Sequence, residues 1–281
     1  MSYSKIKSYA KLNLALNIVG KKNSLHKIES ILTFVNLHDV ILIKKIKFKS
    51  HTISFSGKFS KNIGKNNTVS KLLNILEKKK LLKNKKFEIK VNKQIPNKAG
   101  LGGGSMNAAS VFKFFIKKKI INVTKKEIVE ISRLIGSDVI LGLKQKSAIL
   151  SSKNQIQYFN NIRKFYMLIV KPNFGCSTKD IYSKVKKFHK IKLSQPKKKM
   201  FNFDYLKKMS NDLEIISFSK YPKLKKIKSY LEDSFDPAFV RMTGSGSALV
   251  AYFQSKKRCE RAKQRFNKAY KNFWCIASKT I

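Results

Sequence analysis

A glycine-rich segment is the strongest chemical signal in the chain. Four of the five residues from Gly100 to Gly104 are glycines, and Ser105 follows. Residues without a Cβ atom let backbone amides approach a ligand closely. Apolar residues at helical spacing predict a helix that begins near Ser105 or Met106, and a helix N-terminus adds unpaired N–H groups and the positive end of its dipole. The segment therefore predicts a phosphate-binding loop, in which Ser105 can offer its hydroxyl to phosphate or to a magnesium ligand shell.

Two common phosphate motifs do not fit this segment. A P-loop ends in Gly-Lys-Ser/Thr, and the dinucleotide fingerprint needs a third glycine where Ser105 stands. A Walker-type fold and an NAD site are therefore disfavoured. The alternative interpretation is a flexible glycine hinge, which the helix directly after the loop also disfavours.

A carboxylate and a lysine are the next candidates, because phosphoryl transfer to an alcohol needs a group near the hydroxyl and cations around the phosphates. Asp138 and Lys11 could supply these roles. Taken alone, Asp138 is more often a turn residue or a helix cap, and Lys11 is more often a solvated lysine on a strand. Likewise, His26 alone is more often a surface histidine, and the glycine-rich stretch from Arg241 to Ser247 is more often a tight turn.

The charge of the chain is extreme but evenly spread. There are 62 Lys and Arg residues against 15 Asp and Glu, which gives a formal net charge of +47. Such a charge attracts polyanions. However, the basic residues alternate with apolar ones along the chain and form no single basic arm, so we predict no specific nucleic-acid site.

The three cysteines and the apolar segments bound the cellular context. Cys176, Cys259 and Cys275 form no CxxC pair, which favours neither a disulfide framework nor a cysteine zinc site and fits a reducing compartment. No apolar run approaches the roughly 20 residues that span a bilayer. We therefore expect a soluble cytoplasmic protein, either a monomer or a homodimer.

Strands and helices alternate in the part of the chain that holds these residues. Apolar residues at positions 12, 14, 16 and 18 predict a half-buried strand, with Lys11 and Asn13 together on its other face. A capping-box spacing at Thr124 and Glu127 opens a helix that Gly136 can end, which leaves Asp138 just past a helix end. Further strands are expected at 40–48, 87–91, 165–170 and 249–253, and further helices at 68–82, 205–219, 223–231 and 256–270, with a lysine-rich loop at 184–199.

Together these segments resemble the GHMP family of small-molecule kinases over nearly the whole chain. The resemblance rests on motifs that occur in the family's order. They are Ala10 to Leu14, His26, Ile31 to Asp39, Pro96 to Ala109, Ile135 to Val139, Val170 to Gly175, Asn211 to Glu214 and Met242 to Gly246.

The resemblance implies a two-domain α+β architecture. An N-terminal ATP-binding domain at 1–150 would be similar to the ribosomal S5 domain 2-like fold, and a C-terminal GHMP kinase α/β domain would occupy 151–281. ATP would be a co-substrate, with Mg²⁺ carried by the nucleotide and no metal site on the protein. The nearest resemblance is to family members of the non-mevalonate isoprenoid pathway, which phosphorylate the 2-hydroxyl of cytidylylated methylerythritol.

The resemblance also implies roles for individual residues. Asp138 would be the catalytic base, and Lys11 would hold Asp138 ionised and orient the hydroxyl. Substrate would contact Asn13, His26, Thr178 and Tyr182, with His26 reading the cytosine edge. ATP would contact Pro96, Asn97, Lys98, Ala99, Gly100, Leu101, Gly102, Gly103, Gly104, Ser105 and Met106.

The chain departs from the family pattern at three places. Ser24-Leu25 replaces the Gly-Tyr expected before His26, which removes an aromatic platform for cytosine because leucine cannot stack. Met106 replaces a serine of the ATP loop, and Ile140 replaces a proline after the base. The missing tyrosine supports one alternative, a GHMP kinase with another acceptor, such as homoserine or mevalonate. The charge of +47 and the ribosomal relative of the fold support another, a non-catalytic nucleic-acid-binding protein on a related fold.

Overall fold

The computed structural model describes residues 2–23 and 25–281, so Ser24 lies outside the described residues. The chain divides into two compact units. Unit 1 comprises Met1–Lys11, Leu37–Asn97 and Gly102–Gln145, and unit 2 comprises Leu12–Asn36, Lys98–Leu101 and Lys146–Ile281. The mixture of helices and sheets agrees with the predicted α+β class. The boundary expected near residue 150 stays a prediction.

Two long strands, β1 (Ser4–Lys22) and β2 (Leu25–Ile46), pair with each other. The predicted half-buried strand lies inside β1, but the prediction of one solvated face is wrong. Lys11, Asn13 and Asn17 are as buried as the leucines between them. Alternation identified the two faces correctly, but it could not show that other parts of the fold cover the polar face.

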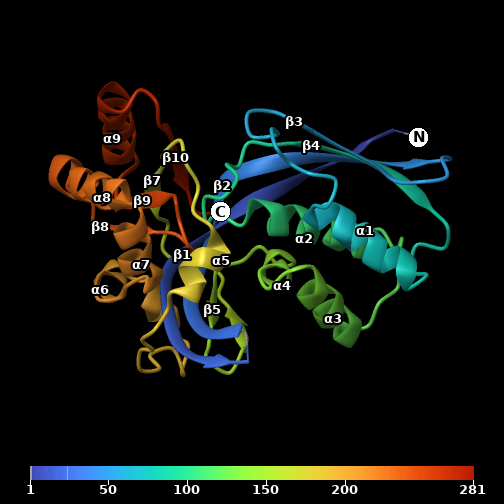
Figure 1. Cartoon of the computed structure of the whole chain (residues 1–281), viewed down its shortest axis with the longest axis horizontal. Coiled ribbons are helices and arrows are strands. Elements are labelled where there is room, and N and C mark those ends of the chain that lie inside the picture. The colour runs from blue at the N-terminus through green and yellow to red at the C-terminus, as the bar shows by residue number, and fades with distance from the viewer. Residues whose placement is uncertain (1, 24) are drawn as a thin grey trace. The chain divides into compact units, whose positions relative to one another are not determined.

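In unit 1 the second half of β2 pairs antiparallel with β4 (Lys86–Asn92), and β4 pairs parallel with β3 (Thr52–Ser56). The helices are α1 (Thr68–Lys78), α2 (Gly103–Lys117), α3 (Lys125–Ile135) and the short α4 (Val139–Gly142). The apolar faces of α1 to α3 form one core with the inner residues of β2 and β4. Figure 1 shows α1 and α2 side by side along this sheet.

In unit 2, residues 30–32 of β2 pair with β5 (Ala148–Leu150), which pairs with β6 (Ile156–Tyr158). A separate antiparallel sheet has the order β10-β7-β9-β8. Its strands are β7 (Tyr166–Lys171), β8 (Phe239–Met242), β9 (Leu249–Phe253) and β10 (Trp274–Lys279). The larger helices α8 (Pro222–Phe235) and α9 (Lys256–Ala269) pack against this sheet, as Figure 1 shows.

Unit 2 also contains smaller helices, and two of them replace one long predicted helix. They are α5 (Thr178–Ser183), the 3-10 helix η1 (Lys198–Phe201), α6 (Phe203–Lys207) and α7 (Leu213–Lys220). The single helix predicted at 205–219 is wrong, because the chain leaves helical geometry between α6 and α7. There the backbone pairs with β1: Leu16 donates its N–H to the carbonyl of Ser210, and Asp212 donates its N–H to the carbonyl of Leu16.

Candidate active site

Lys11 and Asp138 form an ion pair within unit 1. The ammonium of Lys11, on β1, lies 2.9 Å from Oδ2 of Asp138, the residue directly before α4. The lysine side chain is only 5% exposed, whereas that of Asp138 is 33% exposed. The carboxylate is therefore held in place from one side and remains open from the other.

The first turn of α2 lies beside Lys11. Gly102, the N-cap residue, has φ of 68°, and a Cβ atom built on it would sit 3.5 Å from Cε of Lys11. The helix begins at Gly103, two residues before the predicted start, so Gly103, Gly104 and Ser105 supply first-turn amides that have no acceptor inside the helix. The turn bears no acidic residue. This arrangement suits a bound anion.

Gly100 is a glycine for another reason. Its φ is +73°, and a Cβ atom there would lie 2.0 Å from the carbonyl oxygen of Thr243. Thr243 also donates its hydroxyl to the carbonyl of Gly100, at 3.2 Å. The missing side chain at this position makes room for a neighbouring loop of unit 2 and not for a ligand.

A buried ion pair lies behind the start of α2. Lys93 donates to Asp39 Oδ2, and both side chains are almost fully buried. The other carboxylate oxygen of Asp39 accepts the backbone N–H groups of Gln94, at 2.7 Å, and Ile95, at 2.8 Å. A Cβ atom on Gly103 would lie 3.3 Å from the lysine ammonium. A second cation is thus fixed next to the helix terminus.

A small cavity of about 220 Å³ lies against the same helix start. It is bounded by apolar side chains, including Phe55, Ile63 and Val69, and by polar groups that include Lys93 and Asn97. Gly104 lies in its wall, and the hydroxyl of Thr68 donates to the Gly104 carbonyl at 2.6 Å. A mostly apolar lining with a few polar groups is typical of small-molecule sites.

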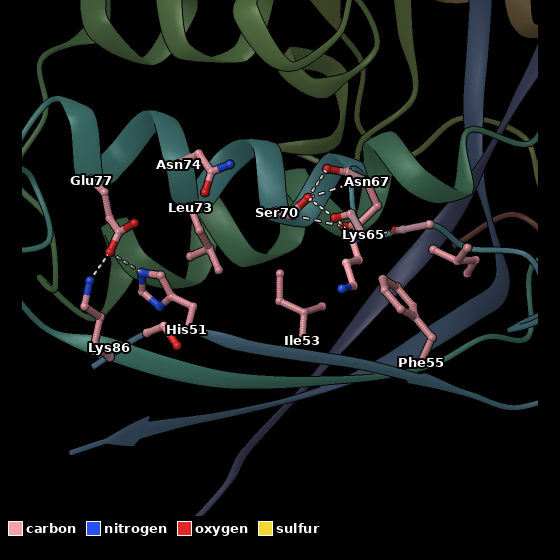
Figure 2. A pocket seen from close by; sticks show the side chains of 13 residues that line it. His51, Ile53, Phe55, Lys65, Asn67, Ser70, Leu73, Asn74, Glu77 and Lys86 are labelled. Atoms are coloured by element: carbon pink, nitrogen blue, oxygen red, sulfur yellow. Dashed lines mark hydrogen bonds and ion pairs between the residues drawn. The ribbon is translucent and has the colours of Figure 1, made fainter. Parts of the chain in front are cut away.

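A larger, more open cavity of about 410 Å³ shares Phe55, Ile63 and Asn67 with the smaller one. Figure 2 shows side chains of α1 and of β3 facing each other across it. At its far end Glu77 pairs with Lys86 and lies 3.1 Å from His51 Nε2. Burial lowers the pKa of His51, and the hydrogen bond from Lys86 lowers the pKa of Glu77.

Asn13 is held by polar contacts inside unit 2. Its backbone N–H donates to the hydroxyl of Thr243 at 3.0 Å, and its side-chain amide donates to Ser30 at 2.8 Å. The Ser30 hydroxyl in turn donates to the carbonyl of Ala15, at 2.7 Å. The β1 backbone and the loop after β8 are therefore joined at this residue.

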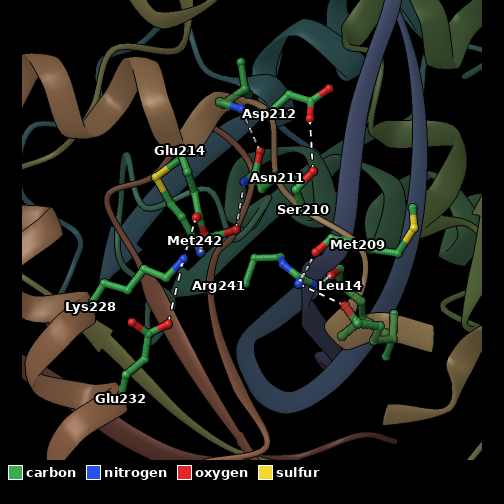
Figure 3. A network of polar contacts seen from close by, with 12 residues as sticks. Leu14, Met209, Ser210, Asn211, Asp212, Glu214, Lys228, Glu232, Arg241 and Met242 are labelled. Carbon is green, nitrogen blue, oxygen red and sulfur yellow. Dashed lines mark hydrogen bonds and ion pairs between the residues drawn. The ribbon is translucent and has the colours of Figure 1, made fainter. Parts of the chain in front are cut away.

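A neighbouring network is centred on Arg241, and Figure 3 shows it. The guanidinium, which is 5% exposed, donates to the carbonyls of Leu14, Leu206 and Met209. Burial lowers the pKa of Arg241. Nearby, Asn211 donates to the carbonyls of Met242 and Gly244 at 2.8 Å each. These contacts fix the break between α6 and α7 against β1.

His26, at the start of β2, lies among aromatic rings. Its centroid is 5.3 Å from that of Tyr182 and 6.5 Å from that of Phe188. Burial lowers the pKa of His26, and the charge of Lys21 lowers it further, so the neutral imidazole is favoured. Thr178, one turn before Tyr182, shares a 2.9 Å hydrogen bond with Ser245.

Two family models match the chain. The model of the GHMP kinases N terminal domain matches residues 67–146, and that of the GHMP kinases C terminal domain matches 186–272. A 4-diphosphocytidyl-2-C-methyl-D-erythritol kinase of Pelagibacter ubique is 58% identical over 281 residues, which is 100% of both chains. The chain belongs to the GHMP kinase family.

Other relatives of the family agree with this assignment. A 4-diphosphocytidyl-2-C-methyl-D-erythritol kinase of Clostridium tetani is 32% identical over 95% of this chain and 98% of its own. A crystal structure of 4-(cytidine 5'-diphospho)-2C-methyl-D-erythritol kinase has a TM-score of 0.79 at 21% identity, covering 99% and 100% of the two chains. Homoserine kinase from Cytophaga hutchinsonii has a TM-score of 0.70 at 15% identity, covering 100% and 95%. These structures show that the fold is the GHMP kinase fold.

As a GHMP kinase, the chain uses ATP as a substrate and acts on a small molecule. Within unit 1 the structure brings together Lys11, Asp138 and the start of α2, and within unit 2 it brings together His26 and Tyr182. Asn97 donates to the carbonyl of Phe59 at 2.8 Å. The predicted roles of these residues stay predictions.

The remaining loop residues are placed as follows. Pro96 and Met106 are buried. The carbonyl of Lys98 accepts the N–H groups of Cys176 and Ser247, and that of Ala99 accepts the N–H of Ala248. Leu101 belongs to the core.

Sequence reasoning missed Lys93, although a signal for it exists. In β4 the odd-numbered residues Phe87, Ile89 and Val91 are buried, and Lys93 continues that series. A lysine in register with a buried strand face is a candidate for a functional cation. Arg241 begins a glycine-rich stretch and Asp39 ends a family motif, but no neighbouring residue in the sequence indicates the contacts that either side chain makes.

Two further results concern metals and membranes. Over residues 2–23 and 25–281, no group of three or more His, Cys, Asp or Glu side chains could hold a metal ion. In the same described residues, no helix is both long and apolar enough to cross a membrane.

Proposed function

We propose that the chain is an ATP-dependent kinase that phosphorylates the 2-hydroxyl of 4-diphosphocytidyl-2-C-methyl-D-erythritol, in the non-mevalonate route to isopentenyl diphosphate. The observation that carries this proposal is the 58% identity to the Pelagibacter ubique kinase over the full length of both chains. The chemistry of the described residues supports it at both ends of the reaction.

At the ATP end, the first-turn amides of α2 hold the phosphates, and the ammonium of Lys93 adds positive charge behind them. The loop residues from Pro96 to Met106 form the nucleotide site. The adenine ring enters the 220 Å³ cavity beside Gly104, where Phe55 and Val69 offer apolar surface.

At the reacting centre, Asp138 is the general base. Its carboxylate accepts the proton of the substrate hydroxyl while the hydroxyl oxygen attacks the γ-phosphorus, and the bond from that phosphorus to the bridging oxygen of ADP breaks. Lys11 holds the carboxylate of Asp138 in position, 2.9 Å from its ammonium. The products are ADP and a phosphate monoester.

Magnesium accompanies the nucleotide. It neutralises charge on the phosphate oxygens when bound. The hydroxyl of Ser105, in the first turn of α2, would be available to the ligand shell of the ion.

At the cytidine end, His26 reads the edge of the base, and Asn13, Thr178 and Tyr182 complete the contacts. Leu25 is 75% exposed and cannot stack on a ring. The ring of Phe188, which is 48% exposed and 6.5 Å from His26, offers an aromatic face in this region. A missing tyrosine before His26 therefore does not remove every stacking surface.

The test is a coupled assay of ADP release with magnesium and ATP. Turnover should require the cytidylylated substrate and should be far lower with homoserine or mevalonate. Equal or better turnover of either of those alcohols would refute the proposed acceptor. Strong salt-dependent RNA binding without any kinase signal would refute the enzyme class.

A further inference from the structure

The segment at 184–197, between α5 and η1, has no regular secondary structure and is here called the strap. Six of its residues are lysines. It carries Phe188, whose ring lies against His26. The position of that ring depends on how the strap is fastened, because no helix or strand holds it.

The strap is fastened on both sides of Lys190. Before it, His189 donates its backbone N–H to the carbonyl of Ile18 at 2.8 Å, and its ring lies 2.6 Å from the carboxylate of Asp212. After it, one carboxylate oxygen of Glu29 accepts two strap N–H groups. The donors are Lys192, at 2.8 Å, and Leu193, at 3.0 Å.

Glu29 is an unexpected residue for its surroundings. Its side chain is 0% exposed, and within the described residues its second oxygen, Oε1, is buried without a hydrogen-bond partner. A buried carboxylate is unfavourable unless hydrogen bonds compensate it. Hydrogen bonds from N–H groups to a carboxylate are stronger than those between neutral groups. Both N–H groups that donate to Glu29 belong to the strap. The carboxylate of Glu29 therefore holds the strap in place through these two hydrogen bonds.

Resting on the function proposed above, we infer that Glu29 is a positioning residue: it fastens the strap so that Phe188 stays against His26, and it thereby sets the affinity for the cytidine end of the substrate. Glu29 lies three residues after His26 on β2. One strand therefore carries both the residue that reads the base and the residue that places the ring beside it.

The kinetic test compares Glu29→Ala with Glu29→Gln. Alanine removes the acceptor, so KM for the cytidylylated substrate should rise about tenfold, with kcat and KM for ATP nearly unchanged. Glutamine keeps an acceptor oxygen and should recover most of the affinity. Lys190→Ala removes a strap charge outside these contacts and should behave as wild type. An unchanged substrate KM in folded Glu29→Ala would overturn the inference, as would equal loss in KM for both substrates.

A variant on the strap side avoids the buried position. Lys192→Pro deletes one donor N–H, and Lys192→Ala removes the same charge while keeping that N–H. The inference requires a higher substrate KM for the proline variant than for the alanine variant. Equal values would contradict it.

Tryptic cleavage gives a readout that does not need activity. The strap lysines should be cut several times faster in Glu29→Ala than in wild type, with cleavage elsewhere unchanged, as mapped by mass spectrometry. Equal rates would show that Glu29 does not fasten the strap. A wild-type chain that ignores the cytidylylated substrate would refute the proposed function, and the cleavage pattern would still decide the role of Glu29.

Discussion

Oδ2 of Asp138 lies 2.9 Å from Nζ of Lys11, and the lysine is the more buried partner by far, at 5% against 33% exposure. The buried partner is the lysine, so its ammonium can hold the carboxylate in a fixed position. The exposed member is the group that can meet a hydroxyl. This asymmetry is what a general base needs, because one side of the carboxylate is fixed and the other is accessible.

Replacing Asp138 by asparagine should therefore remove most of the turnover. We expect kcat to fall by about 10²–10⁴-fold, the usual contribution of a general base, with KM for ATP nearly unchanged. The coupled ADP-release assay measures both. Asp236→Asn is the control, because Asp236 is 90% exposed and sits at φ of 46°, a conformation asparagine accepts. Near wild-type turnover of folded Asp138→Asn would show that another group takes the proton.

Gly100→Ala should destabilise the protein, because the new Cβ atom would lie 2.0 Å from the carbonyl of Thr243. The positive φ alone costs about 1–2 kcal/mol for an alanine, and relief of the clash adds to it. Gly64→Ala is the matched control, since a Cβ atom there meets nothing within 4 Å. Urea unfolding compares the two. Equal stability would mean that the loop around Thr243 moves freely to make room.

Locally coded features could be predicted from the sequence. The capping box of Thr124 and Glu127, and the end of α3 at Gly136, appear as expected, because each depends on residues a few positions apart. The helices α8 and α9 likewise follow from the spacing of their own apolar residues. The helix after the glycine-rich segment also follows from the spacing of its apolar residues, although it begins at Gly103.

Features that depend on distant partners could not be predicted in this way. The segment at 205–219 has helical spacing throughout, yet the side chain of Asn211 donates to the carbonyls of Met242, the last residue of β8, and of Gly244, and the helix is broken there. The polar face of β1 looked solvated, because two of the residues that contact it, Asp138 at Lys11 and Thr243 at Asn13, are more than a hundred positions away. Similarly, nothing near Gly100 indicated that Thr243 fills the space of its missing side chain.

Breaking the buried ion pair of Asp39 and Lys93 should cost both stability and ATP affinity. Asp39→Asn keeps an oxygen for the N–H groups of Gln94 and Ile95 but leaves the lysine charge unpaired and buried. Loss of one partner of a buried pair typically costs about 3–5 kcal/mol. We expect that scale of loss in urea unfolding, together with a higher KM for ATP because Lys93 borders the cavity proposed for the adenine ring.

The exposed pair of Asp180 and Lys220 provides the comparison for that experiment. Asp180→Asn removes a carboxylate whose pKa is lowered mainly by the hydrogen bond from Lys220, but on an open surface. Such pairs contribute little. If both variants lost the same stability, burial would not be the reason that the first pair matters.

Removal of magnesium should stop turnover without loosening the fold. We expect the ion to arrive with ATP, because phosphate oxygens are the hard oxygen ligands that Mg²⁺ prefers. We expect EDTA to abolish ADP release and to leave the melting temperature unchanged. Calorimetric titration of Mg²⁺ into nucleotide-free protein should give no heat of specific binding. A tight site in the absence of nucleotide would contradict this prediction.

The affinity for the cytidylylated substrate should weaken in acid because of His26. Burial, and then the charge of Lys21, lower its pKa from 6.5, so the folded protein keeps the imidazole neutral above that value. As pH falls below 6.5 and through the lowered pKa, the imidazole gains a proton. The neutral ring can accept one hydrogen bond from the base, and the protonated ring can only donate.

Substrate KM should therefore be flat between about pH 8 and 6.5 and should rise below 6.5, while KM for ATP should not follow the same curve. Folding stability should also decrease in acid. The contribution of neutral His26 to the free energy of unfolding is present above pH 6.5 and is lost as pH falls through the lowered pKa. In His26→Gln the acid rise in substrate KM should disappear, because glutamine does not titrate. An identical rise in that variant would assign the effect to another group.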